Sequence, residues 1–191
     1  ISASGEVKTT DSFGVVGPHD NLLPLELFRH ETRLCKFGPY MRQIEAELPK
    51  KTDDLGFLHE TSAAILDKVK YEKARTTVET DAENAAALGV GVCQDHVHIF
   101  LTLVRRQSFA ARYVSGYLIG QAESGYQATH AWAEAYIEGL GWVGFDISNG
   151  ISPDQNYVKL ATGFDYADAR PVSGMRYGEG TEAMSTLVSV Q

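Results

Sequence analysis

The sequence predicts one α+β domain in which helices precede strands along the chain. Apolar residues recur every three or four positions after Pro39 and again over residues 55–70, which is the spacing of an amphipathic helix. Residues 111–119 and 130–147 instead carry β-branched and aromatic residues bounded by glycines, which is typical of strands. Because the two kinds of element are segregated, the pattern favours α+β over a parallel doubly wound sheet.

Four helices are predicted from apolar spacing and from end signals. The first follows Pro39 and places Met41, Ile44 and Leu48 on one face. The second covers Leu55–Lys70. Its expected apolar face comprises Leu58, Ala63, Ile65, Leu66 and Val69.

The third and fourth helices are separated by a glycine-punctuated loop over residues 90–92. Thr80 and Glu83 are expected to form the capping box of the third helix, and Gly89 to end it. The fourth helix, Cys93–Gln107, is apolar enough to be buried.

Short strands are predicted from alternation and from turn residues. They are Val7–Thr10, Ala111–Ile119, His130–Ile137, Trp142–Ile147 and Thr186–Val190. The third and fourth form a hairpin, because only a short turn with two glycines separates them. Residues 163–171 are expected to be irregular.

Length and composition limit the function. The chain has 191 residues, 43% hydrophobic and 22% charged, which fits one globular domain. Its net charge of −8 argues against nucleic acid and anionic membranes as partners. No apolar run reaches the ~18 residues that a membrane span needs. The two cysteines, Cys35 and Cys93, are too few for a secreted scaffold, so we expect reduced thiols and a cytoplasmic protein.

Cys93 has the position of a nucleophilic thiol. It opens the fourth helix after two glycines, where free backbone N–H groups and the helix dipole stabilise a thiolate. The same N–H groups can hold an oxyanion once the thiolate attacks a carbonyl. A buried structural cysteine is the alternative, and position alone does not separate the two.

His130 and Asp146 are the candidates for base and orienting acid. His130 begins a strand on which it shares a face with Trp132, and Asp146 lies on the partner strand of the hairpin. A carboxylate on an adjacent strand can bind an imidazole N–H and fix its tautomer. Both side chains share one face only if the hairpin loop has an odd number of residues or a bulge intervenes.

Asp95, His96 and His98 follow Cys93 closely and invite a zinc interpretation. Their spacing argues against it, because positions two and three apart on a helix do not converge as i and i+4 would, and there is no CxxC motif. We therefore expect no metal and no other cofactor. Asp95 and His98 are expected to brace the helix by hydrogen bonds, and His96 to be partly exposed.

Four sequence blocks in order resemble the transglutaminase-like superfamily. They are Gly91-Val92-Cys93-Gln94-Asp95 with His98, Ala111-Arg112-Tyr113-Val114-Ser115-Gly116-Tyr117, His130-Ala131-Trp132-Ala133-Glu134, and Gly141-Trp142-Val143-Gly144-Phe145-Asp146 followed by Asn149-Gly150. Residues 163–168 and Pro171-Val172 further resemble the bacterial branch described as transglutaminase-like cysteine proteases. The resemblance covers nearly the whole chain.

The resemblance implies a papain-like fold, with a cysteine-bearing helix packed on an antiparallel sheet that carries the histidine and the aspartate. It gives catalytic roles to Cys93, His130 and Asp146. Supporting or substrate-cleft positions fall to Gln94, Asp95, His98, Trp132 and Tyr117. It also implies that residues 1–25 lead in from a missing N-terminal β domain and that residues 26–191 form the catalytic domain.

The sequence departs from the family pattern near the triad. His96 stands where the family commonly has an aromatic or small residue, and Ile147-Ser148 stand where a proline commonly follows Asp146. A tryptophan ahead of the cysteine, the oxyanion donor of well-studied transglutaminases, is also absent. Gln94 and Tyr71 are the alternatives.

The implied activity is acyl transfer from an amide-bearing peptide or protein through a thioester. Cys93 attacks the carbonyl, His130 protonates the leaving amine, and water or a second amine resolves the thioester. Water is favoured, giving a protease or amidase, because this branch is read as hydrolytic and no calcium-loop pattern is present. An amine-accepting transglutaminase and a catalytically inactive peptide-binding module are the alternatives.

Overall fold

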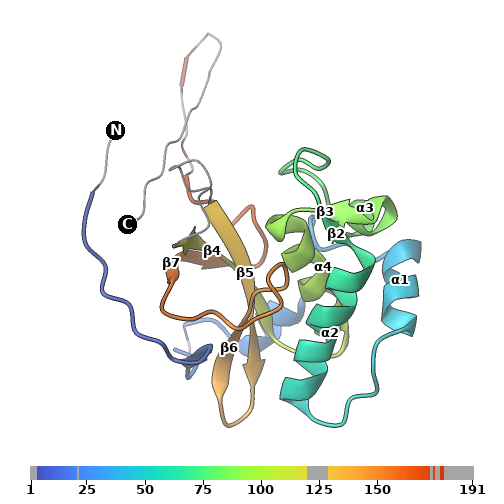
Figure 1. Ribbon diagram of the computed structural model, residues 1–191, viewed down its shortest axis with the longest axis horizontal. Coiled ribbons are helices and arrows are strands. Elements are labelled where there is room, and N and C mark those ends of the chain that lie inside the picture. The colour runs from blue at the N-terminus through green and yellow to red at the C-terminus, as the bar shows by residue number, and fades with distance from the viewer. Residues whose placement is uncertain (1–3, 21, 120–128, 173, 175–176, 179–191) are drawn as a thin grey trace.

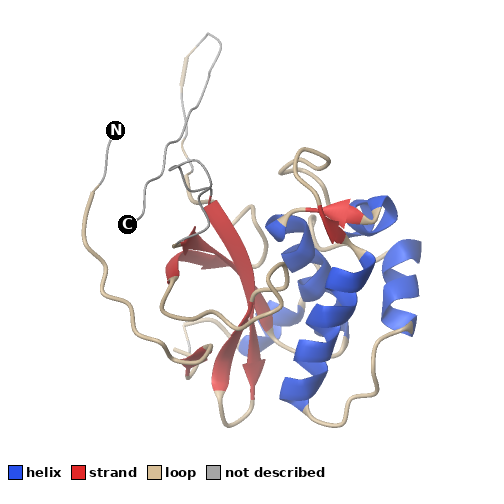
Figure 2. Ribbon diagram, viewed as in Figure 1, coloured by secondary structure: helices blue, strands red, loops and turns tan. Residues whose placement is uncertain are grey.

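The computed structural model describes residues 4–20, 22–119, 129–172, 174, 177 and 178. It has two layers, a group of helices and an antiparallel sheet against which they pack (Figure 1). Figure 2 shows the segregation of helices to one side and of the large sheet to the other. The α+β class predicted from the sequence is confirmed.

All four predicted helices are present. They are α1 (Pro39–Ala46), α2 (Asp54–Lys68), α3 (Ala82–Leu88) and α4 (Cys93–Arg106), and a 3-10 helix, η1 (Leu25–Arg29), precedes them. None of the helices in the described part of the chain is long and apolar enough to cross a membrane.

The predicted capping box of α3 is wrong. Asp81, not Thr80, is the N-cap, and its carboxylate accepts from the backbone N–H of Asn84. Glu83 instead reaches α1, where its carboxylate accepts from the first free N–H groups, those of Tyr40 and Met41. The tertiary contact takes Glu83 away from the local cap, because two unpaired N–H groups at a helix N-terminus attract a carboxylate.

The apolar face predicted for α2 needs one correction. Ala63 is exposed, whereas Thr61 and Ser62 are buried beside Leu58 and Ile65. The four buried positions share the helix face that packs toward α4, so the helix is rotated slightly from the face that hydrophobicity alone indicates.

The large sheet has the strand order β1-β6-β5-β4-β7, and every neighbouring pair is antiparallel. Its strands are β1 (Val15–Gly17), β4 (Ala111–Leu118), β5 (Thr129–Ile137), β6 (Gly141–Phe145) and β7 (Tyr157–Gly163). A separate parallel pair joins β2 (Lys70–Tyr71) to β3 (Val90–Gly91), directly before α4. The loop expected over residues 90–92 therefore contains a short strand.

The sequence was less informative about the other extended segments. Val7–Thr10 is not a strand, because these residues have no partner, and β1 forms further on where it can pair with β6. The edge strand β7 was not predicted, since most of its side chains are exposed or half-buried and give a weak hydrophobic pattern. Residues 163–171 are irregular after β7, as expected. Thr186–Val190 lies outside the described residues.

The helical layer reaches the sheet through α4. On β5 the side chains of Ala131, Ala133 and Ala135 lie in the main core with the apolar residues of α4. Small side chains on this face let a helix approach the sheet closely, and α4 is buried along nearly all of its length. This packing determines the position of Cys93, the first residue of α4, relative to β5.

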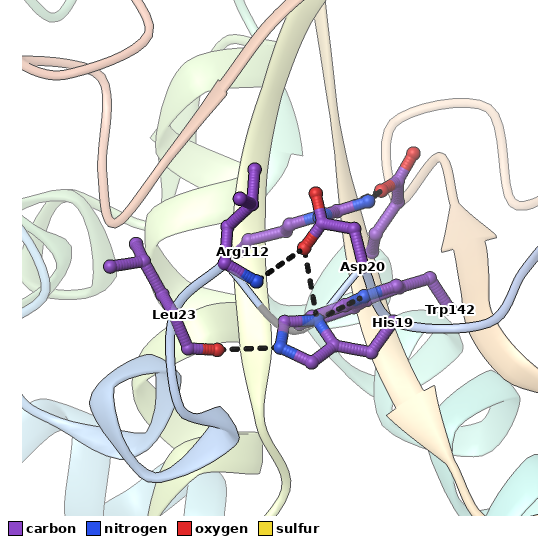
Figure 3. A network of polar contacts seen from close by, with 7 residues as sticks. His19, Asp20, Leu23, Arg112 and Trp142 are labelled. Atoms are coloured by element: carbon purple, nitrogen blue, oxygen red, sulfur yellow. Dashed lines mark hydrogen bonds and ion pairs between the residues drawn. The ribbon is translucent and has the colours of Figure 1, made fainter.

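The N-terminal segment is fastened to the other side of the sheet. The indole Nε1 of Trp142 donates to Nδ1 of His19 at 3.2 Å, and His19 Nε2 donates to the Leu23 carbonyl at 2.5 Å. Figure 3 shows both contacts as dashed lines. The Arg112 guanidinium lies 4.1 Å from the Trp142 ring and is ion-paired to buried Glu134. The domain boundary predicted at residue 25 stays a prediction.

A matched pair of glycines in the β5–β6 turn tests the docking of β1. Gly139 and Gly141 both have positive φ, +85° and +84°, but a Cβ at Gly139 meets nothing within 4 Å, whereas one at Gly141 falls 2.1 Å from the Gly17 carbonyl oxygen. Gly139→Ala is expected to cost about 1 kcal/mol from backbone strain. Gly141→Ala adds the clash and is expected to cost about 1–3 kcal/mol more in denaturant unfolding. Equal losses would contradict this packing.

Candidate active site

The register of the β5–β6 hairpin decides where Asp146 points. Ile137 pairs with Gly141, so the loop is residues 138–140, an odd number. The pairing of Ala133 with Phe145 places Asp146 next to Trp132 on the partner strand, and Trp132 shares its face with His130. His130 and Asp146 therefore lie on the same face of the sheet, and the β5–β6 pair needs no bulge to place them there.

His130 and Asp146 are joined directly. The imidazole Nε2 lies 2.6 Å from Asp146 Oδ2, and the two side chains are 10% and 0% exposed. Cys93 acts on the same imidazole, since its thiol is among the groups that raise the pKa of His130. The structure thus brings together the three residues predicted as catalytic.

These contacts determine the ionisation of the histidine. Burial disfavours the imidazolium, but the hydrogen bonds with Asp146 and Cys93, together with their charges, outweigh it and raise the pKa of His130 to about 10. Burial would likewise raise the pKa of Asp146, but hydrogen bonds from His130, Tyr157 and Asn149 hold it below its usual range. An imidazolium facing a thiol and backed by a carboxylate is the arrangement that activates a cysteine.

Cys93 is partly exposed, whereas Cys35, the other free cysteine, is buried. Cys93 is the first residue of α4, so its N–H belongs to the unpaired N-terminal turn of the helix. Gly91 allows the tight approach before it, because a Cβ there would lie 2.7 Å from the Cβ of Asp95. Asp95 then accepts from the Val92 N–H at 2.8 Å and closes the start of the helix.

Two residues that the sequence reasoning did not assign complete the environment of Asp146. Asn149 donates to Oδ2 from its side chain at 2.7 Å, and the Tyr157 hydroxyl donates to the same oxygen at 2.7 Å. Asn149 stood in a family block and could have been proposed from it. Tyr157 carried no signal, because it belongs to the unpredicted strand β7.

Trp132 packs against His130. It is 3% exposed, and its ring stacks on the imidazole with centroids 6.4 Å apart. Gly116, paired with His130 on β4, makes room for it, since a Cβ there would lie 2.5 Å from the indole. Tyr117 is partly exposed and pairs with Thr129, so it lies beside His130 in the sheet with its side chain on the opposite face.

The other supporting residues brace the start of α4, as expected. Asp95 accepts from the Thr76 hydroxyl at 2.7 Å, and His98 Nε2 accepts from the Tyr166 N–H at 3.3 Å. Gln94 donates one N–H of its side-chain amide to the Val78 carbonyl at 3.2 Å, and its role as oxyanion donor stays a prediction. Within the described ranges no three His, Cys, Asp or Glu side chains gather as metal ligands would.

The expectation that His96 is partly exposed is wrong. It is fully buried, Nε2 contacts the Val69 carbonyl at 2.9 Å, and Nδ1 contacts the Ser148 hydroxyl at 2.8 Å. His96 and Ser148 both stand at positions named above as departures from the family pattern, and they contact each other. Together they tie α4, next to Cys93, to the loop that follows Asp146.

Tyr71 lies at the same end of the helix. Its strand β2 pairs with β3, placing it beside Gly91, two residues before Cys93, and its ring lies 6.2 Å from that of His96. Burial, followed by the charges of Cys93 and Asp146, raises the pKa of Tyr71. The phenol is therefore a protonated donor near the thiol, and its role as oxyanion donor stays a prediction.

Comparison with known proteins agrees with this geometry. Residues 42–147 match the core of the transglutaminase-like superfamily. The chain belongs to this superfamily.

Uncharacterized bacterial proteins are similar to most of the chain. An uncharacterized protein of Mycobacterium leprae is 31% identical over 130 residues, 64% of this chain and 45% of the relative. One of Mycobacterium tuberculosis is 32% identical over 143 residues, 70% of this chain and 45% of the relative. This superfamily chain therefore spans less than half the length of these relatives.

A solved structure supports the fold. The crystal structure of "a Putative Cysteine Protease from Cytophaga hutchinsonii" superposes with a TM-score of 0.68 at 27% identity. The match covers 85% of this chain and 55% of that one. The transglutaminase-like arrangement of helices on an antiparallel sheet, expected from the sequence, is confirmed.

Asp146→Asn tests what raises the histidine pKa. The substitution keeps the shape of the side chain and removes its charge, so the pKa of His130 is expected to fall by about 1–3 pH units from about 10. NMR titration of the His130 ring measures this directly. Asp154→Asn, a change in the turn before β7, is the control and is expected to leave the titration unchanged. A His130 pKa that stays high in Asp146→Asn would contradict the ion pair.

Proposed function

We propose that this protein hydrolyses an amide or peptide bond through a thioester on Cys93. The observation that carries the proposal is the 2.6 Å contact between His130 and the fully buried Asp146 carboxylate, with Cys93 at a helix N-terminus acting on the same imidazole. Membership of the superfamily and the likeness to the Cytophaga protein support it. The proposed class is a protease or amidase acting on peptides or proteins.

Each step uses a group of this chain. The thiolate of Cys93, paired with the His130 imidazolium, adds to the carbonyl carbon, and the Cys93 N–H stabilises the oxyanion. His130 then gives its proton to the leaving amine, and the C–N bond breaks to leave a thioester. Water attacks the thioester while His130 accepts its proton, and the acid product departs from the regenerated thiol.

Asp146 keeps the imidazole oriented and stabilises its positive charge during both transfers. The buried, hydrogen-bonded carboxylate does not need to take a proton. The raised pKa of His130, about 10, favours the positively charged imidazolium at neutral pH. The same triad serves transglutaminases, in which an amine replaces water as the acceptor, so the acceptor has to be measured.

A peptide library containing glutamine, incubated with and without a primary amine, tests the reaction. Release of ammonia or of a cleaved peptide without the amine is expected, and incorporation of the amine would instead indicate transamidation. Cys93→Ala and His130→Ala are each expected to lower the rate at least ~10³-fold. Cys35→Ala is the control. Peptide binding without turnover in the unmodified protein would indicate a binding module and overturn the proposal.

Thiol labelling tests the ion pair without any substrate. With iodoacetamide near pH 6, Cys93 is expected to react about tenfold or more faster than Cys35, because an imidazolium stabilises its thiolate whereas burial raises the pKa of Cys35. Exposure also favours Cys93, so His130→Gln is the decisive variant and is expected to slow labelling of Cys93. Unchanged labelling in this variant would show that His130 does not activate the thiol.

A further inference from the structure

Tyr157 contacts the carboxylate on which the triad depends. Its hydroxyl donates to Asp146 Oδ2 at 2.7 Å, and this oxygen also accepts from His130 at 2.6 Å and from Asn149 at 2.7 Å. Tyr157 is 8% exposed, and burial, reinforced by the negative charge of Asp146, raises the pKa of its hydroxyl. It therefore remains a donor throughout the neutral range.

The contact is long-range within the sheet. Asp146 follows β6 and Tyr157 begins β7, and the order β6-β5-β4-β7 puts two strands between them. In a flat sheet three interstrand spacings would separate them by about 14 Å. The tyrosine side chain nevertheless brings its hydroxyl within 2.7 Å of the carboxylate oxygen.

The tyrosine ring also contacts the catalytic base. Its centroid lies 6.0 Å from that of His130 and 5.4 Å from that of Trp132, and Trp132 itself stacks on the imidazole. His130 is therefore held by Trp132, by Tyr157 and by Asp146, and Tyr157 touches both of the others. Tyr157 therefore contacts His130, Trp132 and Asp146 at once.

We propose that Tyr157 is a positioning residue of the triad, whose hydroxyl holds the Asp146 carboxylate toward His130 and shares its negative charge. The proposal rests on the hydrolytic function proposed above. Three donors on one oxygen compete for its electron density, so loss of the tyrosine hydroxyl leaves more negative charge on the bond to His130. The imidazolium then holds its proton more tightly and gives it up more slowly to the leaving amine, while the carboxylate loses one of its anchors.

Tyr157→Phe isolates the hydroxyl because it keeps the ring and its packing. The kcat for amide hydrolysis is expected to fall about 10- to 100-fold, the range for a lost hydrogen bond to a charged group, while KM changes by less than about twofold. NMR titration is expected to show the pKa of His130 raised further. Tyr136→Phe is the matched control, since Tyr136 lies on the same strand as His130 and packs against Trp142.

The two readouts separate the possible outcomes. A Tyr157→Phe protein with unchanged kcat, and with a His130 pKa that stays or falls, would show that the tyrosine only packs and would overturn the proposal. Thermal unfolding of both variants identifies any loss of kcat that is due to loss of the fold. The titration needs no substrate, so an inactive wild-type protein whose His130 still responds to Tyr157→Phe counts against the proposed function and not against the positioning contact.

Discussion

The hydrogen bond between His130 and Asp146 is the interaction on which the rest of the site depends. It crosses two adjacent strands, and its 2.6 Å length requires a hairpin register in which both side chains face the same side. A shift of one residue would turn Asp146 into the core and leave the histidine without a partner. The odd loop at residues 138–140 and the docking of β1 against Gly141 both fix this register.

One face of β5 packs in the core, and the other carries the catalytic candidate His130. The alanine face lets α4 pack closely and so sets the position of Cys93. The opposite face carries His130, Trp132 and Glu134, and every one of them has a partner that neutralises or covers it. The polar side chains lie on the face away from the helices, so the core between β5 and α4 stays apolar. His130 is near the first end of β5, where it can still reach Cys93 at the start of α4.

The hydrogen bond between His96 and Ser148 joins α4 to the loop that follows Asp146. A buried imidazole needs partners for both ring nitrogens, and the loop after Asp146 supplies one of them. Burial lowers the pKa of His96, so the ring is neutral and can both donate and accept. A proline in place of Ser148 would remove that hydroxyl and leave Nδ1 of His96 without this partner.

The sequence determined the order of elements, the helices from Pro39 onward, the hairpin and the three residues Cys93, His130 and Asp146 that meet in the site. It could do so because periodicity, glycine turns and short ordered motifs are local signals. Only the tertiary structure decided that Glu83 caps α1, that His96 is buried, and that β7 brings Tyr157 to Asp146. The first two contacts join elements that are far apart in the sequence, and the third joins strands that are not neighbours in the sheet. All three depend on how the elements pack, which a local sequence pattern does not encode.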